Sequence, residues 1–223
     1  MGNTRIRATF MALAFFTFVS AEAYETALSP EVVREAYFLG QRRDEKTTAF
    51  LLQYVQRFPP PKTGPHVSQI ELLTPYAFLV QTSRNRSMEY SAQQAEQDYH
   101  KLENTIRVHI SIRFTPTYGF QVTGPSRGET TGNPGIKVHG EDFWRDFTFQ
   151  FTQEQSGDGK PLAPFDMWGE PYYSKTRFGS ALGGADVWLL LDAANVTSDP
   201  IKIDVATPDG QHIPVVFDLS KLR

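Results

Sequence analysis

The chain has 223 residues, of which 22 are Lys or Arg and 25 are Asp or Glu, so its formal net charge is −3, and it contains no cysteine. This mildly acidic, mixed balance gives no electrostatic basis for binding nucleic acid or an anionic membrane surface. The absence of cysteine excludes disulfides, thiolate metal sites and cysteine nucleophiles.

The N-terminal segment has the pattern of a secretory signal peptide. Arg5 and Arg7 give a basic start, residues 8–19 are apolar, and residues 21–23 form a small-x-small cleavage site. As a helix the apolar run would span about 18 Å, too short for a hydrocarbon core of about 30 Å. An uncleaved anchor is the alternative interpretation. We expect the mature chain, residues 24–223, to be exported without a transmembrane span to a bacterial periplasm or the extracellular space.

Two helices are expected at the start of the mature chain. Ser29 is a good N-cap for a helix whose first residue is proline, and Gly40 should interrupt that helix. Asp44 can cap a second helix that runs to about Phe58, with apolar residues at helical spacing. Three consecutive prolines then stop any helix, so residues 59–66 are expected to form an extended connector.

Strands are expected after the connector. Ile70–Leu73 and Tyr76–Val80 have a β-like composition and are separated by a proline. One helix is inserted near residues 91–104, because Ser91 and Gln94 fit a capping box. Residues 106–114 then show the clearest alternation of apolar and polar side chains in the chain, which predicts a strand with one buried face.

Four segments follow that strand. Residues 118–122 alternate and suggest the second strand of a hairpin, and residues 124–135 form a loop rich in Gly, Pro and Thr. Alternating phenylalanines predict a strand over residues 143–151. Pro161–Gly184 mixes Pro, Gly and aromatic residues without periodicity, so we expect an irregular segment, and long ordered loops often carry function.

The C-terminal end has the strongest β pattern. Residues 187–191 are apolar at every position, as in a strand covered on both faces. Residues 201–206 and 213–219 alternate and are joined by Thr207-Pro208-Asp209-Gly210, a sequence that closes a hairpin. Pro214 has no N–H to donate, so the last strand is expected at a sheet edge.

These patterns together predict an α+β protein: an antiparallel β-sandwich or open barrel with N-terminal helices and one inserted helix. The expected organisation is a signal peptide at 1–23, an N-terminal helical segment at 24–58, a Pro-rich connector at 59–66 and a β-rich domain at 67–223.

Two short patterns resemble a catalytic site and a metal site. Residues 124–128 match the G-x-S-x-G nucleophile elbow around Ser126, but that chemistry needs a helix after the serine, and the Gly- and Pro-containing segment that follows cannot form one. His139 with Glu141 and Asp142 is the densest cluster of ligand-type residues, and a polar turn is the simpler interpretation. No H-E-x-x-H or close H-x-H pair occurs among the five histidines, His66, His100, His109, His139 and His212. We therefore assign no catalytic residue, no metal site and no cofactor.

A basic ladder is predicted on the strand at 106–114. Arg107, His109, Ser111 and Arg113 should share one face, because side chains two apart on a strand point the same way. Such a ladder has the chemistry to meet a carboxylate or a phosphate. A solvated outer face of an antiparallel sheet is the simpler interpretation, and we adopt it.

The candidate binding site is a group of aromatic rings and carboxylates in the segment expected to be irregular. Its members are Trp168, Tyr172, Tyr173, Phe178, Asp166 and Glu170. Aromatic rings beside carboxylates suit stacking on a sugar ring or a peptide, with polar groups fixing the orientation. The alternative is that the rings seal one end of a sandwich. Two carboxylates can also serve as acid and base in hydrolysis, at a separation that sequence spacing does not give.

We therefore expect a non-enzymatic, exported envelope protein that binds a small molecule, a glycan or an envelope protein through the Pro161–Gly184 segment. A hydrolase of envelope polymers or esters is the second hypothesis. The third is a structural accessory subunit that offers the N-terminal helices or an edge strand to a partner.

Overall fold

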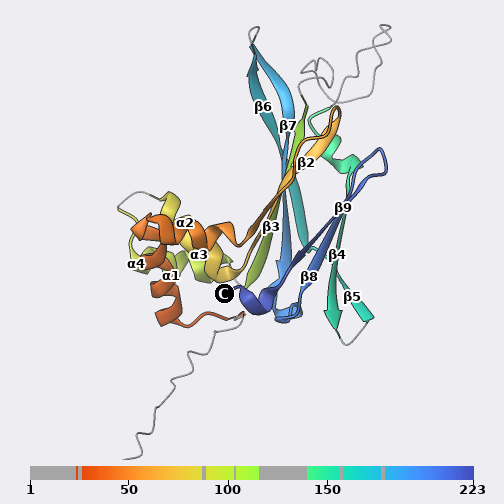
Figure 1. Ribbon diagram of the computed structural model, residues 1–223. Helices are drawn as coiled ribbons and strands as arrows, with labels where there is room; N and C mark the ends of the chain where they lie inside the picture. Colours follow the sequence, from red (N-terminus) through yellow and green to blue (C-terminus); the bar gives the residue numbers. More distant parts are fainter. Residues whose placement is uncertain are drawn as a thin grey trace, which may run out of the picture.

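The computed structural model describes residues 24, 27–86, 89–102, 104–115, 140–155, 158–176 and 179–223. Within these residues four α-helices lie beside two antiparallel sheets, one of five strands and one of four, which confirms the predicted α+β class with packed antiparallel sheets. In Figure 1 the helices lie on one side of the five-stranded sheet, beside its lower half, and the four-stranded sheet lies on the other side. The predicted signal peptide, the 118–122 strand and the 124–135 loop lie outside the described residues.

The bounds of the four helices are α1 (Pro30–Arg42), α2 (Glu45–Leu52), α3 (Pro75–Asn85) and α4 (Ala92–Leu102). Three of the four helices, α1, α2 and α4, begin at caps that the sequence predicts. The Ser29 and Asp44 side chains accept hydrogen bonds from backbone N–H groups in the first turns of α1 and α2. The capping box before α4 is also confirmed, because Ser91 and Gln94 each donate a backbone N–H to the other's side chain.

Three predictions in this region were wrong, and the third concerns Gly40. The second helix ends at Leu52 instead of Phe58, and the chain continues into the short strand β1 (Val55–Arg57). Tyr76–Val80, predicted as a strand, belongs to α3. There Thr74 accepts a hydrogen bond from the Ala77 N–H and Pro75 occupies the first turn, so this proline starts a helix instead of separating two strands.

Gly40 does not interrupt α1, which continues to Arg42. It is instead the point where α1 approaches α3 most closely. A Cβ atom at Gly40 would lie 2.3 Å from the carbonyl oxygen of Val80 and 2.7 Å from the Cβ of Ser83. Only glycine leaves room for this approach of the two helices.

The two sheets have distinct strand orders. The five-stranded sheet runs β1, β2 (Pro65–Leu73), β3 (Thr105–Phe114), β7 (Gly179–Asp192) and β6 (Asp166–Thr176). The four-stranded sheet runs β5 (Asp158–Leu162), β4 (Thr148–Gln155), β8 (Ile201–Ala206) and β9 (His212–Phe217). Three short 3-10 helices, η1 (Phe143–Asp146), η2 (Ala193–Asn195) and η3 (Leu219–Lys221), complete the described elements.

Most of the β predictions are confirmed. The strands expected at 70–73, 106–114 and 187–191 lie in β2, β3 and β7. The hairpin at Thr207–Gly210 joins β8 to β9, with Gly210 at φ 83°, and β9 with its Pro214 is an edge strand. The strand predicted over 143–151 was wrong in its first half, where η1 precedes β4.

The prediction that Pro161–Gly184 is irregular was wrong, because β6 and β7 form a long hairpin there. The apolar alternation of β6 is interrupted because its core side carries Gly169 and Pro171 between Met167 and Tyr173. Gly169 lies against the Trp144 ring, where a Cβ would come within 2.3 Å, and Pro171 is tolerated because β6 is an edge strand.

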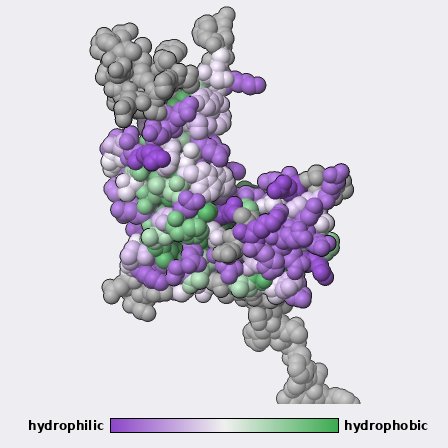
Figure 2. Space-filling view, turned by 180° about the vertical axis from the view of Figure 1, so that it is seen from behind, coloured by the Kyte–Doolittle hydropathy of each residue, from purple (hydrophilic) through white to green (hydrophobic). Residues whose placement is uncertain are grey.

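The main core lies between the two sheets, and a smaller one lies among the helices. The first includes Ile110 and Val187 from the five-stranded sheet and Ile203 from the four-stranded sheet. The second includes Ala36 from α1 and Val80 from α3. In the view of Figure 2, apolar surface gathers on the part built from the sheets, whereas the helical part is largely hydrophilic.

Gly40→Ala should destabilise the protein although alanine is the better helix former. The added Cβ must push α1 away from α3, so we expect the free energy of unfolding to fall by about 2 kcal/mol. The matched control is Gly159→Ala, where the nearest atom to an added Cβ is the Thr152 Cβ at 3.9 Å. Chemical denaturation should show a change below about 0.5 kcal/mol for this control. Equal losses of unfolding free energy in the two variants would contradict the close approach of α1 to α3.

Candidate binding site

The five-stranded sheet turns one face to the core, and its opposite face is called the outer face below. Ile110 of β3 and Val187 of β7 lie opposite each other and are fully buried, so the alternating neighbours His109 and Trp188 lie on the outer face. The helices cover its β2–β3 side, where the Arg107 guanidinium lies 3.8 Å above the Phe78 ring of α3. The outer face of β6 and β7 lies beside this helical wall.

Three rings from three adjacent strands form a stack on the outer face. Trp188 lies opposite His109 of β3 on one side and opposite Trp168 of β6 on the other. The His109 and Trp188 rings have centroids 4.0 Å apart and planes 9° apart, and Trp168 and Trp188 have centroids 6.3 Å apart and planes 17° apart. Cross-strand aromatic pairs of this kind stabilise a sheet and orient each other's rings. This ring stack therefore fixes the orientation of Trp168 at the sheet edge.

A charge network lies beside the ring stack and is centred on Asp186. The carboxylate accepts hydrogen bonds from the Ser111 hydroxyl at 2.9 Å and from Arg113 Nη2 at 2.8 and 3.1 Å. The His109 Nε2 lies 3.1 Å from the same carboxylate, and the His109 Nδ1 lies 3.5 Å from Glu71. Glu71 in turn accepts a hydrogen bond of 2.8 Å from Gln81 of α3. The network therefore connects β2, β3, β7 and the helices.

The prediction that the basic ladder on β3 lies on a solvated outer face was wrong. The His109 side chain is 16% exposed and Ser111 is buried. The predicted chemistry of the ladder does occur, but the carboxylate that it meets is the protein's own Asp186. The ladder therefore serves as an internal support for the outer face.

The pKa of Asp186 reflects this surrounding. Partial burial acts to raise the pKa, but the hydrogen bonds from Arg113, Ser111 and His109 and the charge of Arg113 outweigh it, and the pKa lies below its ordinary value. Asp186 is therefore held in its ionised form, as the acceptor on which the network depends.

Four of the six predicted binding residues lie together on the outer face of β6. Asp166, Trp168, Glu170 and Tyr172 lie two residues apart along the strand and opposite Leu190, Trp188, Asp186 and Gly184 of β7. Asp166 and Glu170 are exposed and Tyr172 is 42% exposed.

The other two predicted residues are not in this group. The pairing of β6 with β7 shifts between Tyr172 and Tyr173, and Tyr173 lies opposite the buried Leu182, on the other side of the sheet. Its hydroxyl donates to Glu141. Phe178 lies outside the described residues.

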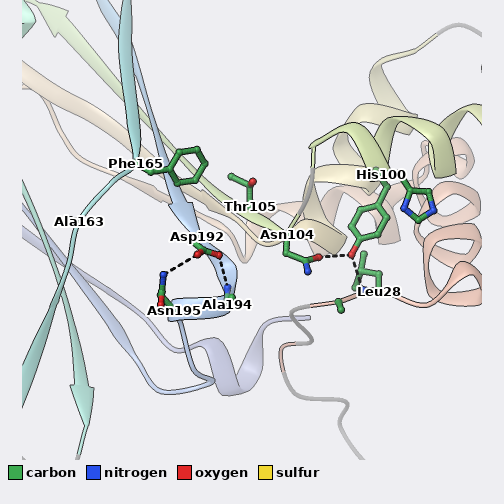
Figure 3. A pocket seen from close by; sticks show the side chains of 11 residues that line it. Leu28, His100, Asn104, Thr105, Ala163, Phe165, Asp192, Ala194 and Asn195 are labelled. Atoms are coloured by element: carbon green, nitrogen blue, oxygen red, sulfur yellow. Dashed lines mark hydrogen bonds between the residues drawn. The ribbon is translucent and has the colours of Figure 1, made fainter.

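A hollow of about 740 Å³ continues the outer face where the end of α4 meets the ends of β6 and β7 (Figure 3). The Tyr99 hydroxyl accepts a hydrogen bond from the Leu28 N–H and donates one to Asn104. Asp192, two residues beyond Leu190 on β7, accepts from the Ala194 N–H and from the Asn195 side chain. Because Asp192 lies eight residues from Gly184 on one strand, the outer face and the hollow together extend over about 27 Å.

The sequence pattern did not identify Trp188, Asp186 or the role of the ladder. Trp188 was assigned only to an apolar run, and Asp186 precedes that run without a motif. The available signal was the polar face of β3, since a half-buried His and Arg on a central strand need partners on the neighbouring strands. The register that supplies those partners depends on long-range pairing.

The remaining histidines do not form a site in the described part of the chain. His212 contacts Asp204 at 3.0 Å between β9 and β8, and His100 lines the hollow. Among the described residues no three His, Cys, Asp or Glu side chains are grouped to hold a metal ion. Ser126 and His139 lie outside the described residues.

No protein-family model matches the chain, and no curated protein sequence matches it significantly. Among the described helices none is long and apolar enough to cross a lipid bilayer.

Asp186→Asn should destabilise the protein in a pH-dependent way. At neutral pH the loss of the charged acceptor should lower the free energy of unfolding by about 2 kcal/mol. Because the pKa of Asp186 is lower in the folded chain than in the unfolded chain, its ionised form adds stability above about pH 4. This contribution is lost as the pH falls through the folded pKa, so the difference between wild type and variant should shrink in acid.

Denaturation curves at neutral and acidic pH measure this difference. Glu170→Gln is the control, because it removes an exposed carboxylate opposite Asp186 and should cause no loss of stability. A difference that stays constant down to acidic pH would rule out the proposed role of the Asp186 charge.

Proposed function

We propose that this protein is an exported, non-enzymatic binding protein of the cell envelope, and that its ligand lies on the outer face of β6 and β7. The observation that carries the proposal is the arrangement of Trp168 and Tyr172, two rings on an edge strand beside exposed carboxylates. The Tyr172 ring is exposed and the Trp168 ring is half-buried, and accessible rings flanked by carboxylates match the stacking of a sugar ring or a short peptide.

The two rings are held in place by side chains of the neighbouring strands on the same face of the sheet. Trp168 is backed by Trp188 and His109, and the Tyr172 ring lies 4.2 Å from the Arg113 guanidinium, which is itself held by Asp186. Side chains whose orientation is fixed before binding lose little conformational freedom when a ligand arrives. This support favours recognition by the face of the sheet.

Recognition by the edge of the sheet is less favoured. Pro171 lacks an N–H in the middle of β6, and the pairing shifts between Tyr172 and Tyr173. Both features discourage the addition of a partner strand. This weakens the hypothesis of an accessory subunit that offers this edge.

A hydrolase is the second candidate, and one observation favours it. Glu170 and Asp186 lie directly opposite each other, a position in which Cβ atoms are typically about 5 Å apart. Paired carboxylates at short range carry out glycoside hydrolysis. However, Asp186 already accepts hydrogen bonds from Ser111 and Arg113, and the hollow in Figure 3 is lined by neither carboxylate, so binding remains the better-supported function.

Trp168→Ala and Tyr172→Ala should each abolish ligand stabilisation. A thermal-shift screen of the protein against oligosaccharides and peptides should find a class that raises the melting temperature of the wild type. Each variant should keep its own fold but lose that rise, because it lacks a ring on the outer face. Tyr173→Ala is the matched control, since Tyr173 is 38% exposed but lies on the other face. If the control lost the effect and Trp168→Ala kept it, the site would lie elsewhere.

The proposal that the protein is exported rests on the basic and apolar pattern of residues 1–23. Tyr24, the first residue after the predicted cleavage site, is already part of the main core, so a cut after Ala23 would remove no described residue. Expressed in a bacterium, the chain should be recovered from the periplasm or medium with Tyr24 as its N-terminal residue, as mass spectrometry would show. Replacing Ala21 and Ala23 by bulky residues should leave the precursor uncut. A full-length chain found in the cytosol would refute export.

A further inference from the structure

We infer that the ligand of the outer face is a cationic glycan, an oligosaccharide that carries free amino groups. This inference rests on the proposed function and adds the chemical class of the ligand. Its support comes from the charges, the rings and the edge of β6.

The charges on the outer face divide into two groups. The Asp186 carboxylate accepts hydrogen bonds from Arg113 and Ser111. The Glu71 carboxylate contacts His109 and accepts a hydrogen bond from Gln81. Asp166 and Glu170 on β6 are exposed, and among the described residues no basic side chain pairs with either of them. The β6 side of the outer face therefore presents negative charge to solvent.

Glu170 also lies directly opposite Asp186 on the neighbouring strand. Like charges in this position repel each other and destabilise a sheet. Arg113 forms an ion pair with Asp186, whereas Glu170 forms no ion pair within the described residues. A ligand with a positive charge at Glu170 would supply the missing partner, whereas an anionic ligand would add to the repulsion.

The rings beside these carboxylates favour the same charge. The faces of Trp and Tyr attract cations, and Tyr172 already has the Arg113 guanidinium 4.2 Å from its ring. Trp168 lies between Asp166 and Glu170 on the same face of β6. An ammonium group near Trp168 would thus be flanked by a ring and two carboxylates.

The edge of β6 favours a glycan over a basic peptide. One common way to bind an extended peptide is to add it as a strand to a sheet edge, and Pro171 with the shifted pairing at Tyr172 and Tyr173 interrupts that edge. A glycan needs ring faces and polar side chains instead. The outer face and the hollow offer both over about 27 Å, which suits a chain of several sugar units.

The test compares glucosamine oligomers with N-acetylglucosamine oligomers of equal length, by calorimetry at mildly acidic pH, where the free amines are charged. The two probes share a ring and a linkage and differ in charge. We expect the glucosamine oligomer to bind about tenfold more tightly. This preference should weaken as salt is added.

Variants of the two β6 carboxylates test whether the preference for the glucosamine oligomer arises from β6. Glu170→Gln and Asp166→Asn should each reduce it severalfold, because they remove one charge without changing the shape of the side chain. Glu141→Gln is the matched control, an exposed carboxylate that contacts Tyr173 away from the outer face, and it should keep the preference. Unchanged melting temperatures without ligand would show that the variants fold.

Three results would overturn the inference. Equal affinity for the two oligomers would show that charge plays no part, while the proposed binding function would stand. An oligolysine peptide that binds more tightly than the glucosamine oligomer at the same residues would assign the site to basic peptides. If neither oligomer bound and no compound of the thermal-shift screen raised the melting temperature, the proposed function itself would fail.

Discussion

The position of β7 between β3 and β6 is the constraint on which the rest of the structure depends. Ala185, Val187, Leu189 and Leu191 on its core face are all buried against the other sheet, and this burial fixes the register of the strand. A slip of one residue would turn every one of these side chains outward. The same register places Trp188 between His109 and Trp168, and Asp186 beside Ser111. The burial of the core side chains of β7 thus also determines the positions of the side chains on its opposite, outer face.

The helices limit which part of that surface is open. They are held near the C-terminal end of the chain, where the Arg223 side chain binds Glu35 of α1 at 2.8 Å and its guanidinium lies 4.5 Å from the Tyr76 ring of α3. The Tyr54 hydroxyl donates to the Arg223 carbonyl, and burial raises the pKa of Tyr54 to about 12, so this donor stays protonated. With α3 held over β2 and β3, the outer face of β6 and β7 remains beside it as the accessible surface.

Local signals in the sequence predicted much of the fold, whereas the site depended on pairing that they do not contain. Ser29, Asp44 and Ser91 start helices because a cap acts within one turn, and Thr207–Gly210 closes a hairpin for the same reason. The prediction of a strand at Tyr76–Val80 was wrong because these residues are buried against α1 as part of a helix, and this packing outweighs their β-like composition. The β6–β7 hairpin was missed because Gly169 and Pro171 replace the expected apolar residues. Asp166, Trp168, Glu170 and Tyr172 were found by residue type, but their support by Asp186 and Trp188 required the register.

The outer face combines features that stability alone does not explain. The charge network is internally satisfied and holds strands and helices together, as buried polar groups in a folded chain must be. On β6 the charges are not balanced in this way, because Glu170 lies opposite the like charge of Asp186, and the Tyr172 ring on the same face is 42% exposed. Natural proteins violate such local rules mainly at functional or strained sites. Because these violations lie on one edge strand and beside a rigid stack of rings, they define the part of the molecule where a ligand would restore the missing contacts.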